Sequence, residues 1–310
     1  RVRATGVCGS DVDGYLGRHP WIHYPIILGH ECSGLVDAVG PGVENWAPGD
    51  AVVVEPFFVC EECPACRRGK YNLCREIDIL GHGRPGAFAE FVLIDERFLH
   101  PLPKGVSFEQ GALAEPVSGS LHAVERCNLS IGDFVVLMGC GTIGYFALQH
   151  VLNSGARVLV SEPDERKRET AEDMGADHTL DPAAESLEDR VLELTDGMGA
   201  DCVIEAVGRQ ETIRQSVSLA RKGGTIMLIG WTGEDTDPFN CTRVTLDEMT
   251  VLGTMGFASD YPVVLDLLAS GKVDAESIIT HLYSLEDTKA ALETLHARRE
   301  GIWKALIVMD

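Results

Sequence analysis

The stretch from Phe134 to Glu162 constrains the fold more than any other part of the chain. Five apolar residues (134–138) lead into a glycine-rich run, Gly139-Cys140-Gly141-Thr142-Ile143-Gly144, which opens a helix-like segment over 143–154. A second apolar segment follows at 157–160. Parallel strands need a crossover between them, usually a helix, and strands that are apolar throughout are covered on both faces. This stretch therefore predicts an α/β domain built around a parallel sheet.

The same alternation continues on both sides of this stretch. We expect further helices at 118–127 and 165–174, and further buried strands at 202–206, 225–229 and 250–253. Together these elements predict a doubly wound parallel sheet.

Residues 1–115 have a different pattern. Short apolar runs such as 26–28, 51–54 and 88–94 are separated by Gly and Pro turn signals, which predicts short strands in an irregular β-rich region. A helix over 261–270 and a closing strand over 303–309 follow the sheet segment. A chain of 310 residues is long enough to form two domains of these two kinds.

The glycine run predicts a dinucleotide site. Gly139 and Gly141 permit a tight turn and close approach of a pyrophosphate, while the following helix N-terminus, with Thr142 and Ile143, offers backbone N–H groups. Gly144 lets the helix pack on the sheet. The alternative is a glycine-rich turn in an α/β domain of another kind, but the complete strand–turn–helix–strand–acid unit favours the dinucleotide.

Glu162, 18 residues beyond Gly144, indicates which dinucleotide is preferred. Its carboxylate would accept hydrogen bonds from ribose hydroxyls and would repel a 2′-phosphate, so NAD is expected rather than NADP. Arg166 is a candidate to cover the adenine, or else a surface arginine. Cofactors lie at the carboxyl ends of parallel strands. The residues at the ends of two further predicted strands are therefore candidates to contact the nicotinamide side of the cofactor: Val207, Gly208, Ile229 and Gly230.

Four cysteines lie within fifteen residues, at Cys60, Cys63, Cys66 and Cys74. Tetrahedral Zn²⁺ takes four sulfurs, and a closed site of this kind is structural. Bacterial ferredoxins share the C-x₂-C-x₂-C start but end in x₃-Cys-Pro, whereas here seven residues separate the last pair and Arg75 follows. A thioredoxin-like pair would need only two cysteines. We therefore predict a structural zinc, and we expect the other five cysteines to be buried packing residues: Cys32, Cys127, Cys140, Cys202 and Cys241.

Charge and hydropathy exclude some classes of partner. Acidic residues outnumber basic ones by 48 to 26, a net charge of −22. A surface of this sign repels phosphate backbones and anionic lipids, so we expect no binding of nucleic acid and none to a membrane surface. No apolar run approaches the ~20 residues that span a bilayer. Metal-binding cysteines rather than disulfides point to a reducing cytoplasm.

Taken together, these motifs resemble the zinc-containing medium-chain alcohol and polyol dehydrogenases. The resemblance covers essentially the whole chain and rests on motifs in the family order: G-x-C-G-S-D around Cys8, Gly29-His30-Glu31, the four-cysteine lobe, Glu115-Pro116, the glycine run, and Ile279-Thr280-His281. The resemblance implies a GroES-like, β-rich catalytic domain over 1–118, a Rossmann-type NAD domain over 119–257, and a C-terminal return over 258–310. It also implies an active site in a cleft between them.

The resemblance implies a second, catalytic zinc, making two per chain. Cys8 and His30 would bind it with help from a carboxylate, and the third ligand is either Glu31 or Glu115. Each arrangement leaves one exchangeable position, as a catalytic zinc requires. Zinc would stabilise the alkoxide of the substrate, and a hydride would pass to the nicotinamide. Ser10 could pass the alcohol proton outward. Asp13 replaces a family histidine, so it is either the outer proton acceptor or a surface turn residue.

The expected activity is oxidation of a polyol, vicinal diol or other secondary alcohol with NAD. Threonine or a sugar acid is the alternative on the same scaffold, and a non-catalytic zinc-stabilised nucleotide-binding protein is a further one. Family members are homodimers or homotetramers. The family also has about thirty residues before its first motif, so we expect the opening strands to be missing from this chain.

Overall fold

A computed structural model of the protein describes residues 1–231, 240–298 and 301–310. The chain divides into two compact units, Arg1–Ser118 with Ala258–Asp310, and Gly119–Phe257. Among the described helices, none is both long enough and apolar enough to cross a membrane.

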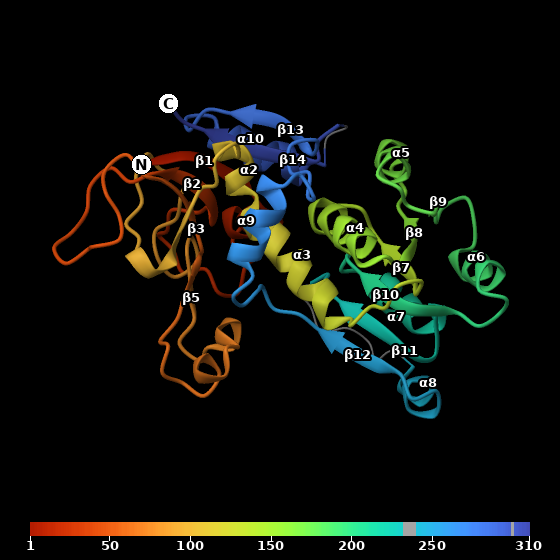
Figure 1. Ribbon diagram of the computed structural model, residues 1–310. Helices are drawn as coiled ribbons and strands as arrows, with labels where there is room; N and C mark the ends of the chain where they lie inside the picture. The colour runs from red at the N-terminus through yellow and green to blue at the C-terminus, as the bar shows by residue number, and fades with distance from the viewer. Residues whose placement is uncertain (232–239, 299–300) are drawn as a thin grey trace. The chain divides into compact units, whose positions relative to one another are not determined.

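The second unit is built on a parallel sheet of six strands in the order β12-β11-β10-β7-β8-β9 (Figure 1). Its strands are β7 (Phe134–Met138), β8 (Arg157–Ser161), β9 (His178–Leu180), β10 (Ala200–Glu205), β11 (Ala220–Leu228) and β12 (Thr250–Gly253). Its helices are α4 (Thr142–Ser154), α5 (Glu165–Asp173), α6 (Leu187–Leu194), α7 (Gln210–Leu219) and α8 (Cys241–Leu246). The predicted parallel α/β sheet is confirmed.

Helices cover both faces of this sheet. The helix α4 packs on β7 and β8, whereas α7 packs on β10 and β11. The chain moves outward from β7 through β8 to β9 and then back across to β10 and β11. Because parallel crossovers are right-handed, this reversal puts the two sets of helices on opposite faces. The apolar strands β7 and β10 are consequently buried along almost their whole length.

The first unit contains a six-stranded sheet in the order β13-β14-β1-β2-β3-β6, with β13 and β14 parallel and the other pairs antiparallel. Its strands are β1 (Val2–Val7), β2 (Glu31–Leu35), β3 (Ala51–Val54), β6 (Leu99–Pro101), β13 (Ile279–Tyr283) and β14 (Lys304–Val308). A separate ribbon pairs β4 (Phe57–Phe58) with β5 (Asp78–Ile79). Chain ends therefore meet in one sheet, since β1 lies beside β14.

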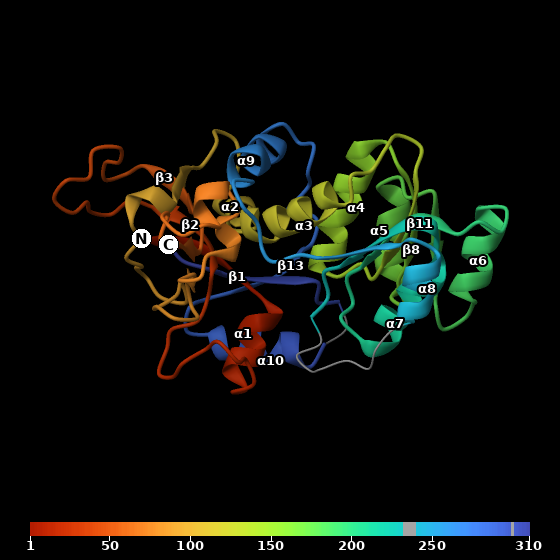
Figure 2. The ribbon, with the colours of Figure 1, turned by 90° about the horizontal axis from the view of Figure 1, so that it is seen from below.

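Helices complete the first unit. They are α1 (Gly9–Tyr15), α2 (Phe108–Ala112), α9 (Tyr261–Ala269) and α10 (Thr288–His296), with short 3-10 turns at Cys66–Arg68, Tyr71–Leu73 and Glu96–Phe98. The helix α3 (Ala114–Arg126) carries the chain into the second unit. Figure 2 shows α1 beside α10, and an apolar cluster of Val7, Val12, Leu292 and Ile307 joins these helices to β14.

Two predicted strands of the β-rich region are wrong. Segments 26–28 and 88–94 are not strands, although both are apolar. They meet through a few irregular bonds instead of a ladder: the N–H groups of Gly86, Ala87 and Phe88 donate to the carbonyls of Ile27, Gly29 and Leu28. The prediction for Cys241 is also wrong, because this cysteine is exposed on α8. The four-residue strand predicted at 51–54 and the helix and strand near the C-terminus are confirmed.

Candidate metal centres and dinucleotide motif

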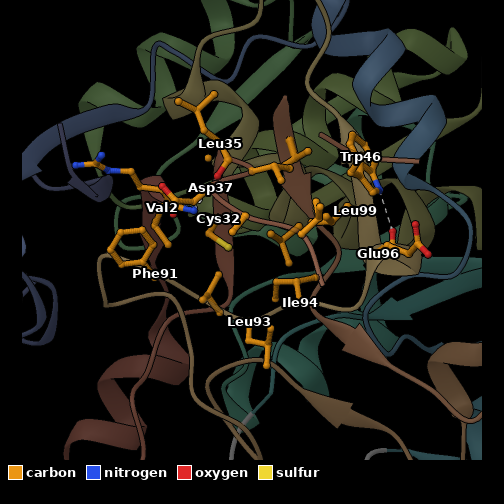
Figure 3. Close-up of a pocket in the computed structure, with 18 of the residues that line it drawn as sticks. Val2, Cys32, Leu35, Asp37, Trp46, Phe91, Leu93, Ile94, Glu96 and Leu99 are labelled. Carbon is orange, nitrogen blue, oxygen red and sulfur yellow. Dashed lines mark hydrogen bonds between the residues drawn. The ribbon is translucent and has the colours of Figure 1, made fainter. Parts of the chain in front are cut away.

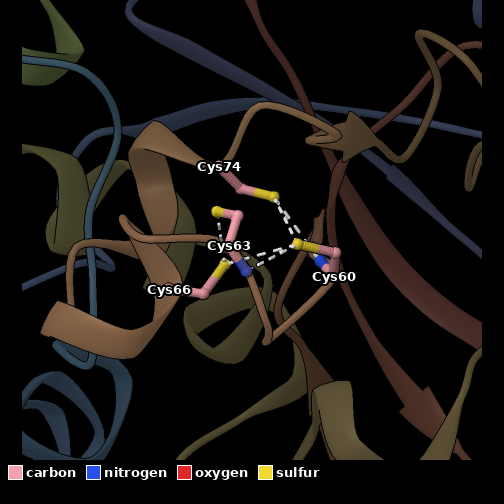
Figure 4. A group of neighbouring side chains, drawn as sticks. All are labelled: Cys60, Cys63, Cys66 and Cys74. Atoms are coloured by element: carbon pink, nitrogen blue, oxygen red, sulfur yellow. Dashed lines mark hydrogen bonds between the residues drawn. The ribbon is translucent and has the colours of Figure 1, made fainter.

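The four clustered cysteines form one group in the first unit (Figure 4). The sulfurs of Cys63 and Cys66 lie 3.5 Å apart, those of Cys60 and Cys74 3.5 Å, and those of Cys60 and Cys66 4.0 Å. Four sulfurs at about 2.3 Å from a tetrahedral ion would lie about 3.8 Å from one another. The group therefore has the dimensions of a closed tetrahedral zinc site.

Backbone groups around the lobe favour a thiolate at Cys63, whereas burial and the neighbouring thiols raise the pKa of Cys66 to about 12. The N–H groups of Cys60, Cys63 and Glu76 donate to cysteine sulfurs at 3.3–3.5 Å. Backbone N–H groups of Cys66 and Arg75 lower the pKa of the Cys63 thiol to about 6. A thiolate is the form that binds metal. Leu73 of the lobe is 56% exposed and contributes little apolar burial, and a bound metal would add stabilisation.

A second group joins Cys8, His30 and Glu31, whose ligand atoms all lie within 4.8 Å of one another. Sheet register explains this convergence. The antiparallel strands β1 and β2 pair Gly6 with Glu31, so Cys8, just beyond the end of β1, lies beside the start of β2. His30 and Glu31 are buried, and Cys8 is half-buried. Sulfur, imidazole and carboxylate donors together make a mixed site of the catalytic kind.

Asp11 supports this group from behind. Its buried carboxylate accepts the N–H of Cys8 at 2.9 Å and that of Gly29 at 3.0 Å, and lies 3.5 Å from Nδ1 of His30. Burial alone would lower the pKa of His30, but the charge of Asp11 outweighs it and raises the pKa well above the ordinary value. The negative charge of Asp11 thus favours a positive charge at the imidazole of His30. A carboxylate behind a histidine ligand is the usual second support of a metal site.

Lys304 supports Glu31 in the same way. Its buried ammonium group lies 2.8 Å and 2.6 Å from the two carboxylate oxygens of Glu31 and donates to the carbonyl of Val7 at 3.1 Å. A Cβ at Gly6 would lie 1.9 Å from one of these oxygens, so the glycine makes room for the carboxylate. Glu31 therefore has a fixed position in which its negative charge is balanced.

Glu115 lies at the start of α3 and is half-buried. Among the described residues it does not belong to the group of converging ligand atoms. Burial raises the pKa of Glu115 to about 7, with His30 opposing and the carboxylate of Glu31 adding to the rise. It is thus near enough to the group to interact with its charges without sharing its centre.

The two predicted proton-transfer residues have different surroundings. Ser10 is half-buried in the first turn of α1, two residues after Cys8. Asp13 forms an ion pair with Arg18 at 2.9 Å, and both side chains are well exposed. Because Asp13 lies within α1, the pair favours a surface role for this residue, but on a helix and not in a turn.

Sequence reasoning missed Asp11, Lys304 and two histidines near the second group. His82 is buried, and its ring centre lies 5.4 Å from that of His30 and 4.7 Å from that of His19. Burial lowers the pKa of His82 to about 3. Asp11 could have been found from the motif, because it is the acid of G-S-D, but Lys304 and His82 stand in stretches without a motif.

The glycine run of the second unit has the geometry that its residues predict. Gly139 has φ +90°, and a Cβ at Gly144 would lie 2.1 Å from the carbonyl oxygen of Gly139. Gly141 precedes the first residue of α4, and a Cβ there would meet nothing within 4 Å. The turn therefore needs two of its glycines for itself, and the third leaves open space at the N-terminus of α4.

Glu162 directly follows β8 and is tied to the glycine run. Its carboxylate accepts the N–H of Cys140 at 2.7 Å and that of Asp164 at 3.0 Å. Each carboxylate oxygen keeps a further lone pair for a ribose hydroxyl. Arg166 is exposed and lies 3.6 Å from Asp164, which gives it the surroundings of a surface arginine.

The remaining predicted cofactor residues meet at the carboxyl ends of β10 and β11. The N–H groups of Val207 and Gly208 donate to the side chain of Glu205 at 3.0 and 2.9 Å, and those of Ile229 and Gly230 donate to its backbone carbonyl at 2.9 and 3.1 Å. A Cβ at Gly139 would lie 2.8 Å from Val207. Three strand ends thus lie together at one edge of the sheet.

A cavity of about 510 Å³ in the first unit lies apart from these groups (Figure 3). Apolar side chains such as Leu35, Trp46, Ile94 and Leu99 line it. Successive residues of a strand face opposite sides, so Cys32 lines this cavity whereas its neighbour Glu31 belongs to the metal group.

Comparison with known proteins gives matches over both units. A family model described as alcohol dehydrogenase GroES-like domain matches residues 1–104, and one described as zinc-binding dehydrogenase matches residues 142–270. The sorbitol dehydrogenase of Bacillus subtilis is 33% identical, over 94% of this chain and 84% of that protein.

Solved structures extend the likeness to three dimensions. The 2R,3R-butanediol dehydrogenase of Bacillus subtilis has a TM-score of 0.91 at 32% identity, covering 100% of this chain and 91% of that one. An alcohol dehydrogenase of Escherichia coli, solved with NADH, has a TM-score of 0.93 at 27% identity, covering 99% and 90%.

Proposed function

This chain belongs to the family of zinc-binding alcohol dehydrogenases with a GroES-like domain, and we propose that it oxidises a polyol, vicinal diol or related secondary alcohol with NAD. The observation that carries this proposal is the convergence of the Cys8, His30 and Glu31 ligand atoms within 4.8 Å of one another. A nucleotide-binding module would have no use for a set of sulfur, imidazole and carboxylate donors, whose three ligands leave a tetrahedral zinc one coordination position for a substrate.

The residues of the second group fit a zinc ion. Cys8, His30 and Glu31 would hold it, Asp11 would keep the imidazole of His30 oriented, and Lys304 would keep the carboxylate of Glu31 in place. When bound, zinc would supply Lewis-acid stabilisation of the alcohol oxygen, and NAD would accept the hydride. Ser10 lies in the first turn of α1, two residues after Cys8, and we assign its hydroxyl to carry the alcohol proton away.

The direct carboxylate ligand is Glu31 in this proposal. One of its carboxylate oxygens converges with the ligand atoms of Cys8 and His30, whereas Glu115 acts on the group through its charge. Glu115 would then hold a substrate hydroxyl or a water beside the zinc. The four-cysteine lobe would hold the second, structural zinc, as its sulfur distances support.

The unit Arg1–Ser118 with Ala258–Asp310 would be the catalytic domain, and Gly119–Phe257 the cofactor domain. The N-terminus of α4 would receive the pyrophosphate, and Glu162 the ribose hydroxyls. We further propose a cytoplasmic homodimer or homotetramer that binds neither nucleic acid nor membrane, in keeping with its net charge of −22.

The test is a substrate panel with zinc-loaded protein. Sorbitol, the 2,3-butanediol stereoisomers, threonine and 2-butanol would each be offered with NAD and with NADP, and NADH or NADPH would be followed by absorbance. We expect a polyol or diol with NAD to give the highest kcat/KM. Absence of turnover with every alcohol, in protein that carries zinc and binds NAD, would overturn the proposal.

The cofactor preference has its own variant. Replacing Glu162 by Ala removes the carboxylate that a 2′-phosphate would meet, so the ratio of kcat/KM for NAD to that for NADP should fall by about tenfold or more. The exposed Glu165→Ala serves as the control, and an unchanged ratio in Glu162→Ala would remove Glu162 from the ribose site.

A further inference from the structure

His82 is held against the second metal group by the backbone. It follows β5 in a turn where its N–H donates to the carbonyl of Ile79 at 3.0 Å. Gly81, directly before it, has φ +75°, and a Cβ there would lie 2.9 Å from backbone atoms of Gly29. Because Gly29 precedes His30, this close approach of two backbones places the imidazole of His82 beside that of His30.

The imidazole of His82 is buried without hydrogen bonds. Its residue is 7% exposed, and among the residues the structure describes neither Nδ1 nor Nε2 has a hydrogen-bond partner. Its ring packs at 61° to that of His30 and at 45° to that of His19. A buried polar atom without a partner destabilises a folded protein, because it has lost its hydrogen bonds to water. An apolar side chain would fill the same space without this penalty. The unpaired nitrogens therefore indicate that His82 hydrogen-bonds a ligand when the protein functions.

The metal group does not use these nitrogens. Cys8, His30 and Glu31 converge without His82, although its ring lies against that of His30. A neutral imidazole offers one donor and one acceptor. A hydroxyl group also has one hydrogen-bond donor and can accept hydrogen bonds. It is therefore the simplest partner for a neutral imidazole that lies next to a site for alcohols.

We propose that His82 hydrogen-bonds a second hydroxyl group of the substrate and thereby distinguishes polyols and vicinal diols from simple secondary alcohols. This inference rests on the proposed function of the same site. A site built to bind a hydroxyl group discriminates strongly against analogues that lack it, because its polar atoms then stay unpaired. His82 would contact the substrate away from the carbon that is oxidised, so its effect belongs in binding rather than in the chemical step.

The experiment compares His82→Leu, which keeps the volume but removes both nitrogens, with His82→Gln, which keeps a donor and an acceptor. The exposed His23→Leu is the matched control. Zinc content and melting temperature establish that each variant is folded. For (2R,3R)-butanediol, sorbitol and 2-butanol, kcat and KM are measured separately with NAD. Titration calorimetry of zinc-loaded protein with NADH gives the dissociation constant of each alcohol independently of turnover.

We expect His82→Leu to weaken binding of the diol or polyol by about 10–100-fold, chiefly in KM and the dissociation constant, and to leave 2-butanol within about threefold. His82→Gln should recover most of the loss, and His23→Leu should show none. Equal weakening of 2-butanol, or unchanged binding of both diol and polyol, would overturn the role of His82. A wild-type protein that binds no alcohol at all would overturn the proposed function itself, and with it this inference.

Discussion

The two candidate metal groups lie in the same unit but are assembled in opposite ways. The four-cysteine group comes from one lobe of fifteen residues, and backbone N–H groups of that lobe and of Glu76 just after it donate to its sulfurs. Glu31 opens β2, His30 directly precedes that strand and Cys8 directly follows β1, and this group is held by side chains as distant in sequence as Lys304. The four-cysteine group is local in sequence and has only sulfur donors. The second group is brought together by the sheet and has sulfur, nitrogen and oxygen donors.

This difference indicates, for each group, whether the metal stabilises the protein or the protein fixes the metal site. We expect a lobe that exposes Leu73 and holds four thiols to depend on a bound metal for a fixed shape. The second group has its shape before any metal binds, because sheet register, Asp11 and Lys304 already fix each donor. Loss of metal should therefore unfold the lobe, whereas at the second group it should abolish activity and leave the fold intact.

The largest effect should come from the lobe. Replacing Cys60 and Cys66 together by Ser removes half of its donors, and structural zinc contributes about 10–16 kcal/mol of apparent binding energy in small domains. We expect a fall of at least about 10 °C in melting temperature, measured by calorimetry. The exposed Cys241→Ser should melt like the wild type. A double variant that melts unchanged would contradict a stabilising metal.

Cys8→Ser should separate activity from stability. Loss of this donor should lower kcat/KM for the best alcohol by about 10³-fold or more, equivalent to about 4 kcal/mol of transition-state stabilisation. The melting temperature should move by only a few degrees, and NAD binding, followed by calorimetry, should persist. Full activity in this variant would end the assignment of a catalytic metal to the second group.

Lys304→Met tests whether the second group is fixed by its surroundings. Removing one partner of a buried ion pair leaves Glu31 with an uncompensated charge, which destabilises a protein by about 3–5 kcal/mol. Urea unfolding should show this loss, and adding Glu31→Gln should restore part of it. Lys289, which is exposed on α10, provides the control, and its change to Met should shift stability by less than about 0.5 kcal/mol. Equal effects of the two lysines would show that the buried pair contributes nothing special.

The smallest effect concerns the two glutamates. Because Glu31 converges with Cys8 and His30 and Glu115 does not, Glu31→Gln should weaken zinc binding at this site more than Glu115→Gln does. For Glu115→Gln we expect a loss of about 10–100-fold or less, the range of supporting residues around a metal. Competition with a chelator of known affinity measures both. The reverse order would make Glu115 the direct ligand.

The comparison also explains what the sequence could predict. The lobe and the glycine run are local, so their spacing was enough to place four cysteines and the turn before α4. The donors Cys8 and His30 could be found only through the resemblance to a family, since 21 residues separate them and no spacing rule joins them.

Other features depend on contacts that no local pattern records. Lys304 meets Glu31 across 273 residues of sequence, and His82 reaches His30 only because Gly81 packs on Gly29. The apolar segments 26–28 and 88–94 looked like strands, but irregular hydrogen bonds from residues 86–88 to residues 27–29 take the place of a ladder. Cysteine is a residue type that usually packs in the interior, but Cys241 is exposed on α8.

The most direct test of the account is the number of zinc ions per chain, measured by mass spectrometry after exhaustive dialysis. We expect two in the wild type, one in Cys8→Ser with the fold retained, and one or none in Cys60→Ser/Cys66→Ser together with loss of stability. A wild-type protein with one zinc, or a Cys8→Ser variant that still holds two, would contradict two separately assembled metal sites.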